Sequence, residues 1–190
     1  MRVPVMDSSI ITLYHGSIYD FEKIDVTQGK PNKDFGRGFY TSRTEQHAVN
    51  LARRNQQIEQ NRLSLLPVAH IHKSVNAWLY VYKFDTLKLD RLNVKEFKQA
   101  DLEWVDFIVE NRTNPNPHHN YDIVIGPTAN DDTLITIAAL LNRTYGDPKS
   151  DRAKELFLEF ILVDKLPHQM FFGTDKATSL LIFKERRIIS

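Results

Sequence analysis

Hydrophobic residues recur along the chain with two different periods, which predicts a mixture of strands and helices. Short apolar runs and alternating patterns predict strands over residues 10–14, 77–84, 121–126, 169–173 and 181–189, with 87–89 as a short partner strand. Apolar positions at helical spacing predict helices from 42 towards 66, over 99–112, from 131 onwards, over 151–162 and over 174–180. The strand over 77–84 is apolar on both faces, so we expect it at the centre of a sheet. The expected fold class is α+β.

Polar residues at the predicted helix starts indicate how these helices begin. Ser42 and Glu45 have the spacing of a capping box, in which the two side chains satisfy free backbone N–H groups at the helix start. Asp101 is expected to cap the helix that ends near Arg112. Residues 130–132 (Asn-Asp-Asp) are expected to cap the following helix.

Composition and charge exclude several classes of protein. The 190 residues carry a formal net charge of +1, which argues against binding nucleic acid through bulk charge. The chain has no cysteine, which excludes thiol nucleophiles, disulfide scaffolds and zinc ribbons. No apolar run approaches the roughly 20 residues of a membrane-spanning helix, and none near the N-terminus fits a signal peptide. We therefore expect one cytoplasmic domain over residues 1–190 that does not enter a membrane. A secreted effector that a dedicated apparatus delivers would need no signal peptide, and it is the alternative.

Polar residues gather at three places where predicted strands begin or end. His15 precedes Gly16, which permits a sharp turn or the close approach of another backbone or a ligand. The segment 34–40 contains two glycines but matches neither the dinucleotide-binding nor the phosphate-loop pattern. Gln169 lies near the start of a later strand. Taken alone, the pattern explains Tyr40 as a core aromatic and His15 as a hydrogen-bonded strand-end residue.

Four sequence blocks, in this order, resemble a bacterial family placed in the ADP-ribosyltransferase superfamily. They read Leu-Tyr-His-Gly-Ser at 13–17, Asp-Phe-Gly-Arg-Gly-Phe-Tyr at 34–40, Tyr-Asp-Ile-Val-Ile-Gly-Pro at 121–127 and Gln-Met-Phe-Phe-Gly-Thr-Asp-Lys-Ala at 169–177. The resemblance spans nearly the whole chain. It implies a split antiparallel β-core with surrounding helices, and NAD bound as substrate in a cleft.

The resemblance assigns roles to residues that match the branch shared with poly(ADP-ribose) polymerases and diphtheria-type toxins. In that branch a His, a Tyr and an acidic residue on three strands form the NAD pocket. The matching His15 would bond a ribose hydroxyl of NAD, and the Gly16 backbone would hold the nicotinamide carboxamide. Tyr40 would stack on the nicotinamide ring, a role suited to an aromatic face.

Three further residues complete the expected NAD-binding set. Arg37 would pair with the pyrophosphate, because a guanidinium fits phosphate oxygens, although a solvated side chain explains it equally well. Gly38 lies beside it in the glycine-rich segment. Ser42 would contact the nicotinamide amide, although the capping box accounts for Ser42 without a ligand.

Gln169 departs from the pattern, because a Glu normally occupies the third catalytic position. An amide can accept a hydrogen bond, but it carries no charge and cannot act as a general base. Loss of one aimed electrostatic group costs about 10²–10³ in rate, so we expect slow mono-ADP-ribosylation unless another carboxylate compensates. The candidate carboxylates are Asp34, Asp122, Asp131 and Asp132. The last two are also explained as helix caps.

The histidines outside the resemblance predict no metal site. His70 and His72 share one face of a possible strand, and His118 and His119 lie in a loop. Their spacing suggests no third or fourth ligand, so we expect surface histidines and no metal cofactor.

The expected function is an NAD-dependent mono-ADP-ribosyltransferase that modifies a macromolecule, either protein or nucleic acid. By analogy with the superfamily, it would be the toxin of a bacterial toxin–antitoxin pair, with a small antitoxin protein as partner. Alternatives are an NAD glycohydrolase, a catalytically silent module that binds NAD or a partner, and a metal-free ribonuclease that uses His15.

Overall fold

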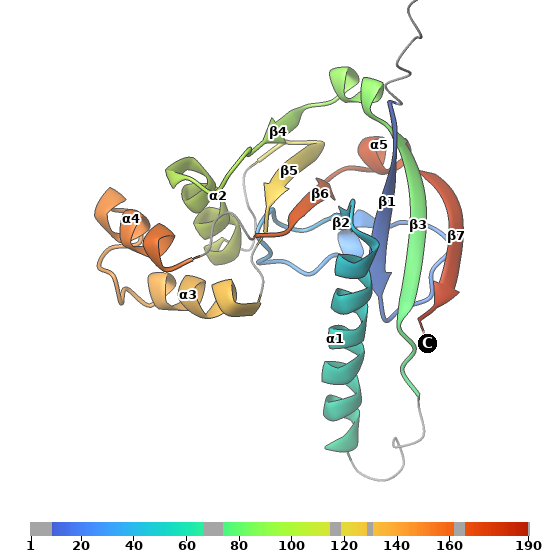
Figure 1. Ribbon diagram of the computed structural model, residues 1–190, viewed down its shortest axis with the longest axis horizontal. Coiled ribbons are helices and arrows are strands. Elements are labelled where there is room, and N and C mark those ends of the chain that lie inside the picture. Colours follow the sequence, from blue (N-terminus) through green and yellow to red (C-terminus); the bar gives the residue numbers. More distant parts are fainter. Residues whose placement is uncertain (1–8, 67–73, 115–118, 129–130, 162–165, 190) are drawn as a thin grey trace, which may run out of the picture. The chain divides into compact units, whose positions relative to one another are not determined.

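Seven strands, mostly antiparallel, follow the hydrogen-bonded order β4-β5-β6-β2-β1-β3-β7 among the described residues (Figure 1). The structure, a computed structural model, describes residues 9–66, 74–114, 119–128, 131–161 and 166–189. Helices accompany these strands, which confirms the α+β class. The chain forms two compact units, with 1–23, 41–91 and 179–190 in the first and 24–40 and 92–178 in the second. Strand β2 (Phe39–Ser42) contributes residues to both units.

The first unit is built around strand β3 (Trp78–Asp85). Strand β1 (Ile10–Ser17) pairs antiparallel with it along its whole length. Strand β7 (Ile182–Ile188) pairs on the other side, with an irregularity between Val81 and Tyr82. The predicted central strand is therefore confirmed. The 3₁₀ helix η3 (Thr86–Arg91) follows β3 and occupies the place where residues 87–89 were expected to form a strand, so that prediction is wrong.

Helix α1 (Glu45–Ser64) packs against β1 through small residues. Ala48 and Ala52 are buried at this contact. A Cβ atom on Gly16 would lie 2.0 Å from the carbonyl oxygen of Ala48 and 3.0 Å from the Cβ atom of Ala52. Gly16 thus permits a close backbone approach, as predicted, but the approaching group is the protein's own helix.

The start of α1 corrects the predicted capping box. The helix begins at Glu45, and its N-cap residue is Thr44, whose side chain makes no capping hydrogen bond. The Ser42 hydroxyl instead accepts a hydrogen bond from the Thr44 backbone N–H at 3.0 Å. Strand β2 extends through Ser42, which keeps this residue outside the first helical turn.

The sheet of the second unit surrounds strand β5 (Ile123–Pro127). Strand β4 (Val94–Glu96) runs parallel to it, and β6 (His168–Phe172) pairs antiparallel on its other side. In that register Gly126 lies opposite Gln169. The three-residue strand β4 was not predicted, because so short a segment carries no clear alternating pattern.

Four helices lie in the described part of the second unit: α2 (Leu102–Thr113), α3 (Asp131–Leu141), α4 (Asp151–Phe160) and the short α5 (Asp175–Thr178). The unit also contains the 3₁₀ helix η1 (Val26–Gln28). As predicted, the Asp101 carboxylate caps α2 by accepting the Trp104 backbone N–H at 2.9 Å. The α3 side chains of Asp131 and Asp132 lie outside the described structure, so their capping role stays a prediction.

The core of the second unit is rich in aromatic side chains. The fully buried members include Phe35, Trp104, Phe157 and Phe171. The indole N–H of Trp104 donates to the Pro127 carbonyl at 2.8 Å, which ties α2 to the end of β5. No helix in the described parts of the chain has the length and apolar character needed to cross a bilayer. In those same parts, no three His, Asp or Glu residues are grouped to hold a metal ion.

Candidate functional site

His15 lies inside β1 of the first unit, rather than in a turn after it, because the strand continues to Ser17. Its half-buried ring lies 5.8 Å from Phe21 and 6.0 Å from Tyr80, between ring centroids. Those two aromatic rings are stacked at 4.1 Å. The Tyr80 hydroxyl accepts the Phe21 backbone N–H at 2.8 Å and donates to the Tyr19 carbonyl at 3.0 Å. The imidazole therefore lies beside a fixed aromatic pair.

Ser42 belongs to the same unit and lies on β2, the strand that pairs with β1. It lies opposite Tyr14 in the register of β1 and β2, next to the position of His15. The Ser42 side chain is buried, and its hydroxyl already accepts the Thr44 N–H. The hydroxyl keeps its O–H donor and a second acceptor lone pair, and its role toward nicotinamide stays a prediction.

Tyr40, in the second unit, closes the glycine-rich segment through its hydroxyl. That hydroxyl donates to the Gly36 carbonyl at 2.6 Å and accepts the Phe35 backbone N–H at 3.1 Å. Gly36 has a φ of 82°, which is favourable only for glycine and turns its carbonyl group. Burial, and then the nearby Asp34 carboxylate, raises the pKa of the Tyr40 hydroxyl well above its ordinary value. Tyr40 is therefore a neutral phenol and cannot act as a base near neutral pH.

The ring of Tyr40 packs against two phenylalanines of the core. Its centroid lies 6.2 Å from the nearly parallel ring of Phe35 and 5.1 Å from Phe171, which meets it edge-on. Tyr40 as a whole residue is half-buried. These contacts account for Tyr40 as a core aromatic, and stacking on a ligand ring stays a prediction.

Packing explains Gly38, and a backbone contact explains the position of Arg37. A Cβ atom on Gly38 would lie 2.3 Å from the Phe171 ring and 2.6 Å from the Phe172 carbonyl oxygen. The exposed guanidinium of Arg37 donates to the Thr27 carbonyl at 3.1 Å. This bond uses one of the five N–H donors of Arg37, and the others leave room for an anion.

Gln169 is half-buried on β6, in the second unit. Side chains alternate along a strand, so Gln169 projects to the same face as Phe171, which contacts Tyr40. His168 projects to the opposite face and is exposed. Gln169 and Tyr40 are therefore connected through Phe171, within the second unit. Arg37 and Gly38 also belong to this unit, whereas His15, Gly16 and Ser42 belong to the first.

Two of the candidate carboxylates are engaged in the second unit. A guanidinium nitrogen of Arg112 lies 2.6 Å from the buried Asp34 carboxylate. Asp122 accepts hydrogen bonds from the Thr174 hydroxyl at 2.7 Å and from Lys176 at 3.2 Å. Burial alone would raise the pKa of Asp122, but these bonds and one from the Asn93 backbone hold it below its ordinary value. Both carboxylates are explained by structural contacts.

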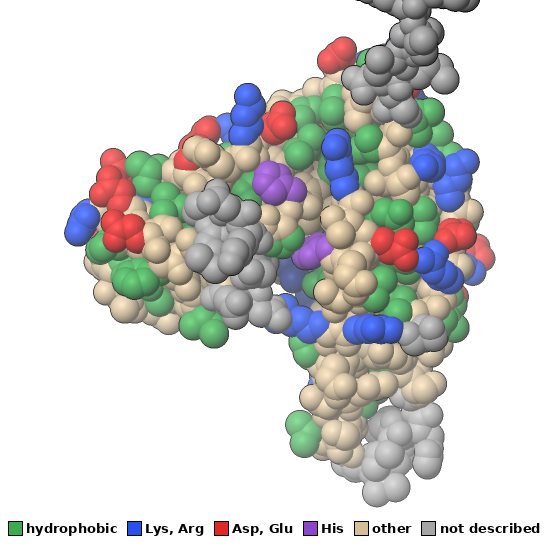
Figure 2. Space-filling view, in the orientation of Figure 1, with side chains coloured by type: hydrophobic (Ala, Val, Ile, Leu, Met, Phe, Trp, Pro, Cys, Tyr) green, Lys and Arg blue, Asp and Glu red, His purple; other side chains and the backbone are tan. Residues whose placement is uncertain are grey.

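Charged side chains of both signs intermingle on the face shown in Figure 2. In the first unit, Arg186 pairs with Asp20 at 3.0 Å, and Arg187 pairs with Glu45. This mixture agrees with the net charge of +1.

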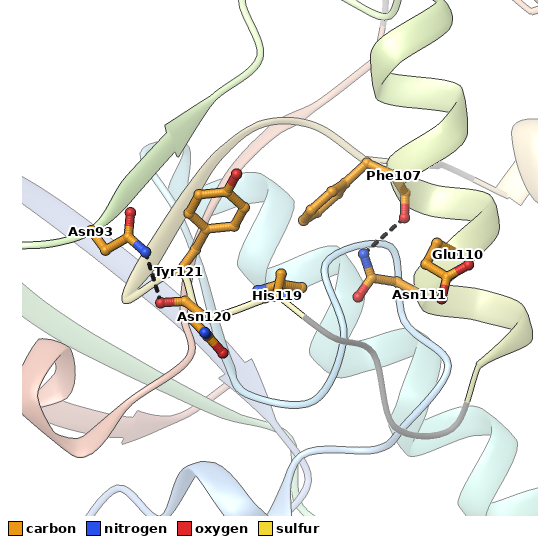
Figure 3. Close-up of a pocket in the computed structure, with 7 residues that line it drawn as sticks. All are labelled: Asn93, Phe107, Glu110, Asn111, His119, Asn120 and Tyr121. Atoms are coloured by element: carbon orange, nitrogen blue, oxygen red, sulfur yellow. Dashed lines mark hydrogen bonds between the residues drawn. The ribbon is translucent and has the colours of Figure 1, made fainter.

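A pocket of about 550 Å³ in the second unit was missed by the sequence analysis. Its lining residues are Asn93, Phe107, Glu110, Asn111, His119, Asn120 and Tyr121 (Figure 3). His119 was expected on the surface, but it is half-buried, and a ring nitrogen, Nε2, lies 3.0 Å from the Phe35 carbonyl oxygen. That prediction is wrong because the His119 ring packs against the aromatic rings of Phe107, Tyr121 and Phe171. The other three histidines of that group, His70, His72 and His118, lie outside the described residues.

One sequence signal could have indicated this pocket. The buried face of α2 is formed by Trp104, Val105, Ile108 and Val109, and Asn111 belongs to the same face. A polar side chain on an apolar helix face needs a hydrogen-bond partner in the interior or a functional reason to be there.

Comparisons with known proteins give a family but no activity. No curated protein matches the sequence. A family model described as "Protein of unknown function (DUF3990)" matches residues 11–183, and the chain belongs to this family.

Proposed function

We propose that the protein is an NAD-dependent mono-ADP-ribosyltransferase. The observation that carries the proposal is the ordered resemblance of four sequence blocks to the ADP-ribosyltransferase superfamily. The residues that match its His, Tyr and Glu positions lie on three different strands, His15 on β1, Tyr40 on β2 and Gln169 on β6. This placement on three strands supports the proposal.

In the proposed mechanism, His15 holds a ribose hydroxyl and Tyr40 supplies a flat surface for the nicotinamide ring. The stacked pair of Phe21 and Tyr80 restricts the orientation of the His15 ring. The bonds to Phe35 and Gly36 restrict Tyr40 in the same way. Side chains that are already oriented reduce the entropy lost when NAD binds.

Gln169 would position the ribose hydroxyl of the nicotinamide nucleoside without charge. The leaving of nicotinamide places positive charge on the ribose, which a carboxylate would stabilise better than an amide. Asp34 and Asp122 are engaged by Arg112, Thr174 and Lys176, so neither is a ready substitute. These contacts favour slow transfer of single ADP-ribose groups.

The biological setting belongs to the same proposal. By analogy, the protein would act in the bacterial cytoplasm as the toxin of a toxin–antitoxin pair, restrained by a small antitoxin protein. Its acceptor would be a macromolecule, protein or nucleic acid. Neither NAD chemistry nor this setting calls for a metal ion.

A silent NAD-binding module is the second candidate, and Gln169 favours it. Without a charge at the third position, the chain could bind NAD and leave the glycosidic bond intact. NAD glycohydrolysis is a third candidate, in which water replaces the acceptor. Dependence of turnover on an acceptor separates hydrolysis from transfer.

The test is transfer of radiolabel from NAD that is labelled in the adenylate phosphate. The full chain is incubated with labelled NAD, with and without cell extract, and macromolecules are separated from free nucleotide. The proposal predicts labelling of a macromolecule by the native chain and by His168→Ala, whose exposed side chain faces away from Gln169, but not by His15→Ala. Nicotinamide release without extract would favour hydrolysis. NAD binding without release or labelling would favour the silent module.

A further inference from the structure

The pocket beside helix α2, hereafter the Asn111 pocket, is lined by residues whose burial increases from its rim to its floor, as in a ligand-binding site. Its floor is Asn111, whose side chain is only 1% exposed. Its walls are three half-buried rings, those of Phe107, His119 and Tyr121. Its rim is formed by the exposed residues Asn93, Glu110 and Asn120 (Figure 3).

The orientation of the Asn111 amide is fixed by chemistry. Its side-chain nitrogen donates to the Phe107 carbonyl at 2.8 Å. The flipped amide is excluded, because it would place two acceptors, the amide oxygen and the carbonyl oxygen, against each other. The amide oxygen is therefore the atom left over, and it is buried with no hydrogen-bond partner among the described residues. A buried acceptor without a partner costs about 1–3 kcal/mol, so it needs an explanation.

His119 presents a second acceptor of the same kind. Nε2 faces the Phe35 carbonyl oxygen at 3.0 Å, which requires a proton on that nitrogen. Burial lowers the pKa of His119, opposed by the bond to Phe35, so the ring is neutral at pH 7. Nδ1 then carries a lone pair, and it too is buried without a partner in the described structure. Phe107 contacts both residues, because its backbone carbonyl accepts the Asn111 amide and its ring centroid lies 5.1 Å from that of His119.

The aromatic walls and the charge of the rim restrict the chemical class of ligand that the pocket can bind. His119 and Tyr121 are stacked at 5.6 Å between ring centroids, and Phe107 lies 6.2 Å from Tyr121. Among the seven described lining residues, Glu110 is the one that carries a charge at neutral pH. The lining therefore combines π-faces, a carboxylate and two buried acceptors, and it offers no cation to an anionic ligand.

We infer that the Asn111 pocket binds a guanidinium group, presented by an arginine side chain of a partner protein. A guanidinium is planar, carries five N–H donors and no acceptor, and stacks on aromatic faces. It can satisfy Asn111 Oδ1 and His119 Nδ1 with donors and pair with Glu110 at the rim. A water molecule could also satisfy the two acceptors, but it would leave the aromatic walls wet. The inference does not depend on NAD chemistry, and its failure would leave the proposed function untouched.

The test is an NMR titration of the full, isotope-labelled chain with N-acetyl-arginine methylamide. The matched probe is N-acetyl-citrulline methylamide, which has nearly the same shape but is neutral and replaces an N–H₂ group with a carbonyl. We expect saturable shifts of the backbone amides of 107–111 and 119–121 with the arginine probe. The citrulline probe should bind at least about tenfold more weakly, because bonds to a charged donor are stronger.

Two charge-neutralising variants control for non-specific attraction. Glu110→Gln should weaken arginine binding about threefold, the size expected for one exposed ion pair. Glu159→Gln removes the same charge from an exposed position on α4 and should leave binding unchanged. Asn111→Leu should abolish binding, and the two exposed variants keep the test decisive if that one does not fold. Equal binding of the two probes, an unchanged affinity in Glu110→Gln, or no shift at these amides would overturn the inference.

Discussion

Arg112 and Asp34 form a mostly buried ion pair across 78 residues of sequence, with a guanidinium nitrogen 2.6 Å from the carboxylate oxygen. The two side chains are 18% and 7% exposed. The pair ties helix α2 to the glycine-rich segment, directly before Phe35, whose backbone N–H bonds the Tyr40 hydroxyl. One contact therefore links the helix that forms the Asn111 pocket to the segment that positions Tyr40.

Removal of this pair should destabilise the fold. Arg112→Met leaves the Asp34 carboxylate buried and uncompensated, which should lower the free energy of unfolding by about 3 kcal/mol in chemical denaturation. Arg37→Met is the control, because its guanidinium is exposed, and its effect should stay within about 0.5 kcal/mol. Adding Asp34→Asn to the Arg112→Met chain should restore part of the loss. Equal stability of the two single variants would show that the pair contributes little.

Substitutions of Tyr40 should separate its hydroxyl from its ring. Tyr40→Phe leaves the Gly36 carbonyl and the Phe35 N–H without their partner, and should cost about 2 kcal/mol of stability. If the chain remains folded, this variant should retain nicotinamide release from NAD, since the aromatic face is kept, whereas Tyr40→Ala should lose it. Tyr19→Phe, at a 67% exposed tyrosine, should change neither quantity. Full stability in Tyr40→Phe would contradict the structural role of the hydroxyl.

Gly16→Ala should destabilise the first unit because the added Cβ atom has no space. The nearest atom is the Ala48 carbonyl oxygen at 2.0 Å, which belongs to the backbone of α1 and cannot move alone. We expect a loss of about 2–3 kcal/mol, the upper part of the range for overpacked sites. Gly146→Ala is a useful comparison, because a Cβ atom there meets nothing within 4 Å and only its φ of 104° opposes the change. A Gly16→Ala chain as stable as the native one would disprove the close contact with α1.

Stability should fall as the pH drops below about 6.5, in part because of His119. Burial, opposed by the Phe35 hydrogen bond, lowers the pKa of His119 in the folded chain below 6.5, the usual histidine value. The unfolded chain then binds a proton at a higher pH than the folded one, so the contribution of His119 is complete above pH 6.5 and is lost below it. Burial of His47 acts in the same direction. Denaturation at pH 7.5 and 5.5 should show a smaller pH effect in His119→Phe, and an unchanged effect would refute the assignment.

Most helices and longer strands could be predicted because their patterns are local. The helix over 102–113 shows apolar residues at helical spacing and an Asp101 cap, and both are visible in the sequence. The prediction that Ser42 caps the first helix was wrong, because strand β2 continues through Ser42 and the helix begins only at Glu45. Pairing between distant segments decides such boundaries, and a local pattern does not contain it.

The candidate site could be predicted only in part. The matching positions of His15, Tyr40 and Gln169 came from the resemblance, and the structure places each on a strand. The closure of the Asn111 pocket by His119 depends on a contact with Phe35, 84 residues away, which no spacing in the sequence indicates. Long-range contacts of this kind also explain the engagement of Asp34, which had been a candidate catalytic carboxylate.

The most direct test of the NAD chemistry is the rate of nicotinamide release by Gln169→Glu beside the native chain. A carboxylate at this position would supply the charge that the amide lacks, so release in the presence of cell extract should rise about 10²–10³-fold. Gln60→Glu makes the same change at an exposed position of α1 and should leave the rate as it is. If neither the native chain nor Gln169→Glu releases nicotinamide under any condition, the proposed transferase activity is wrong.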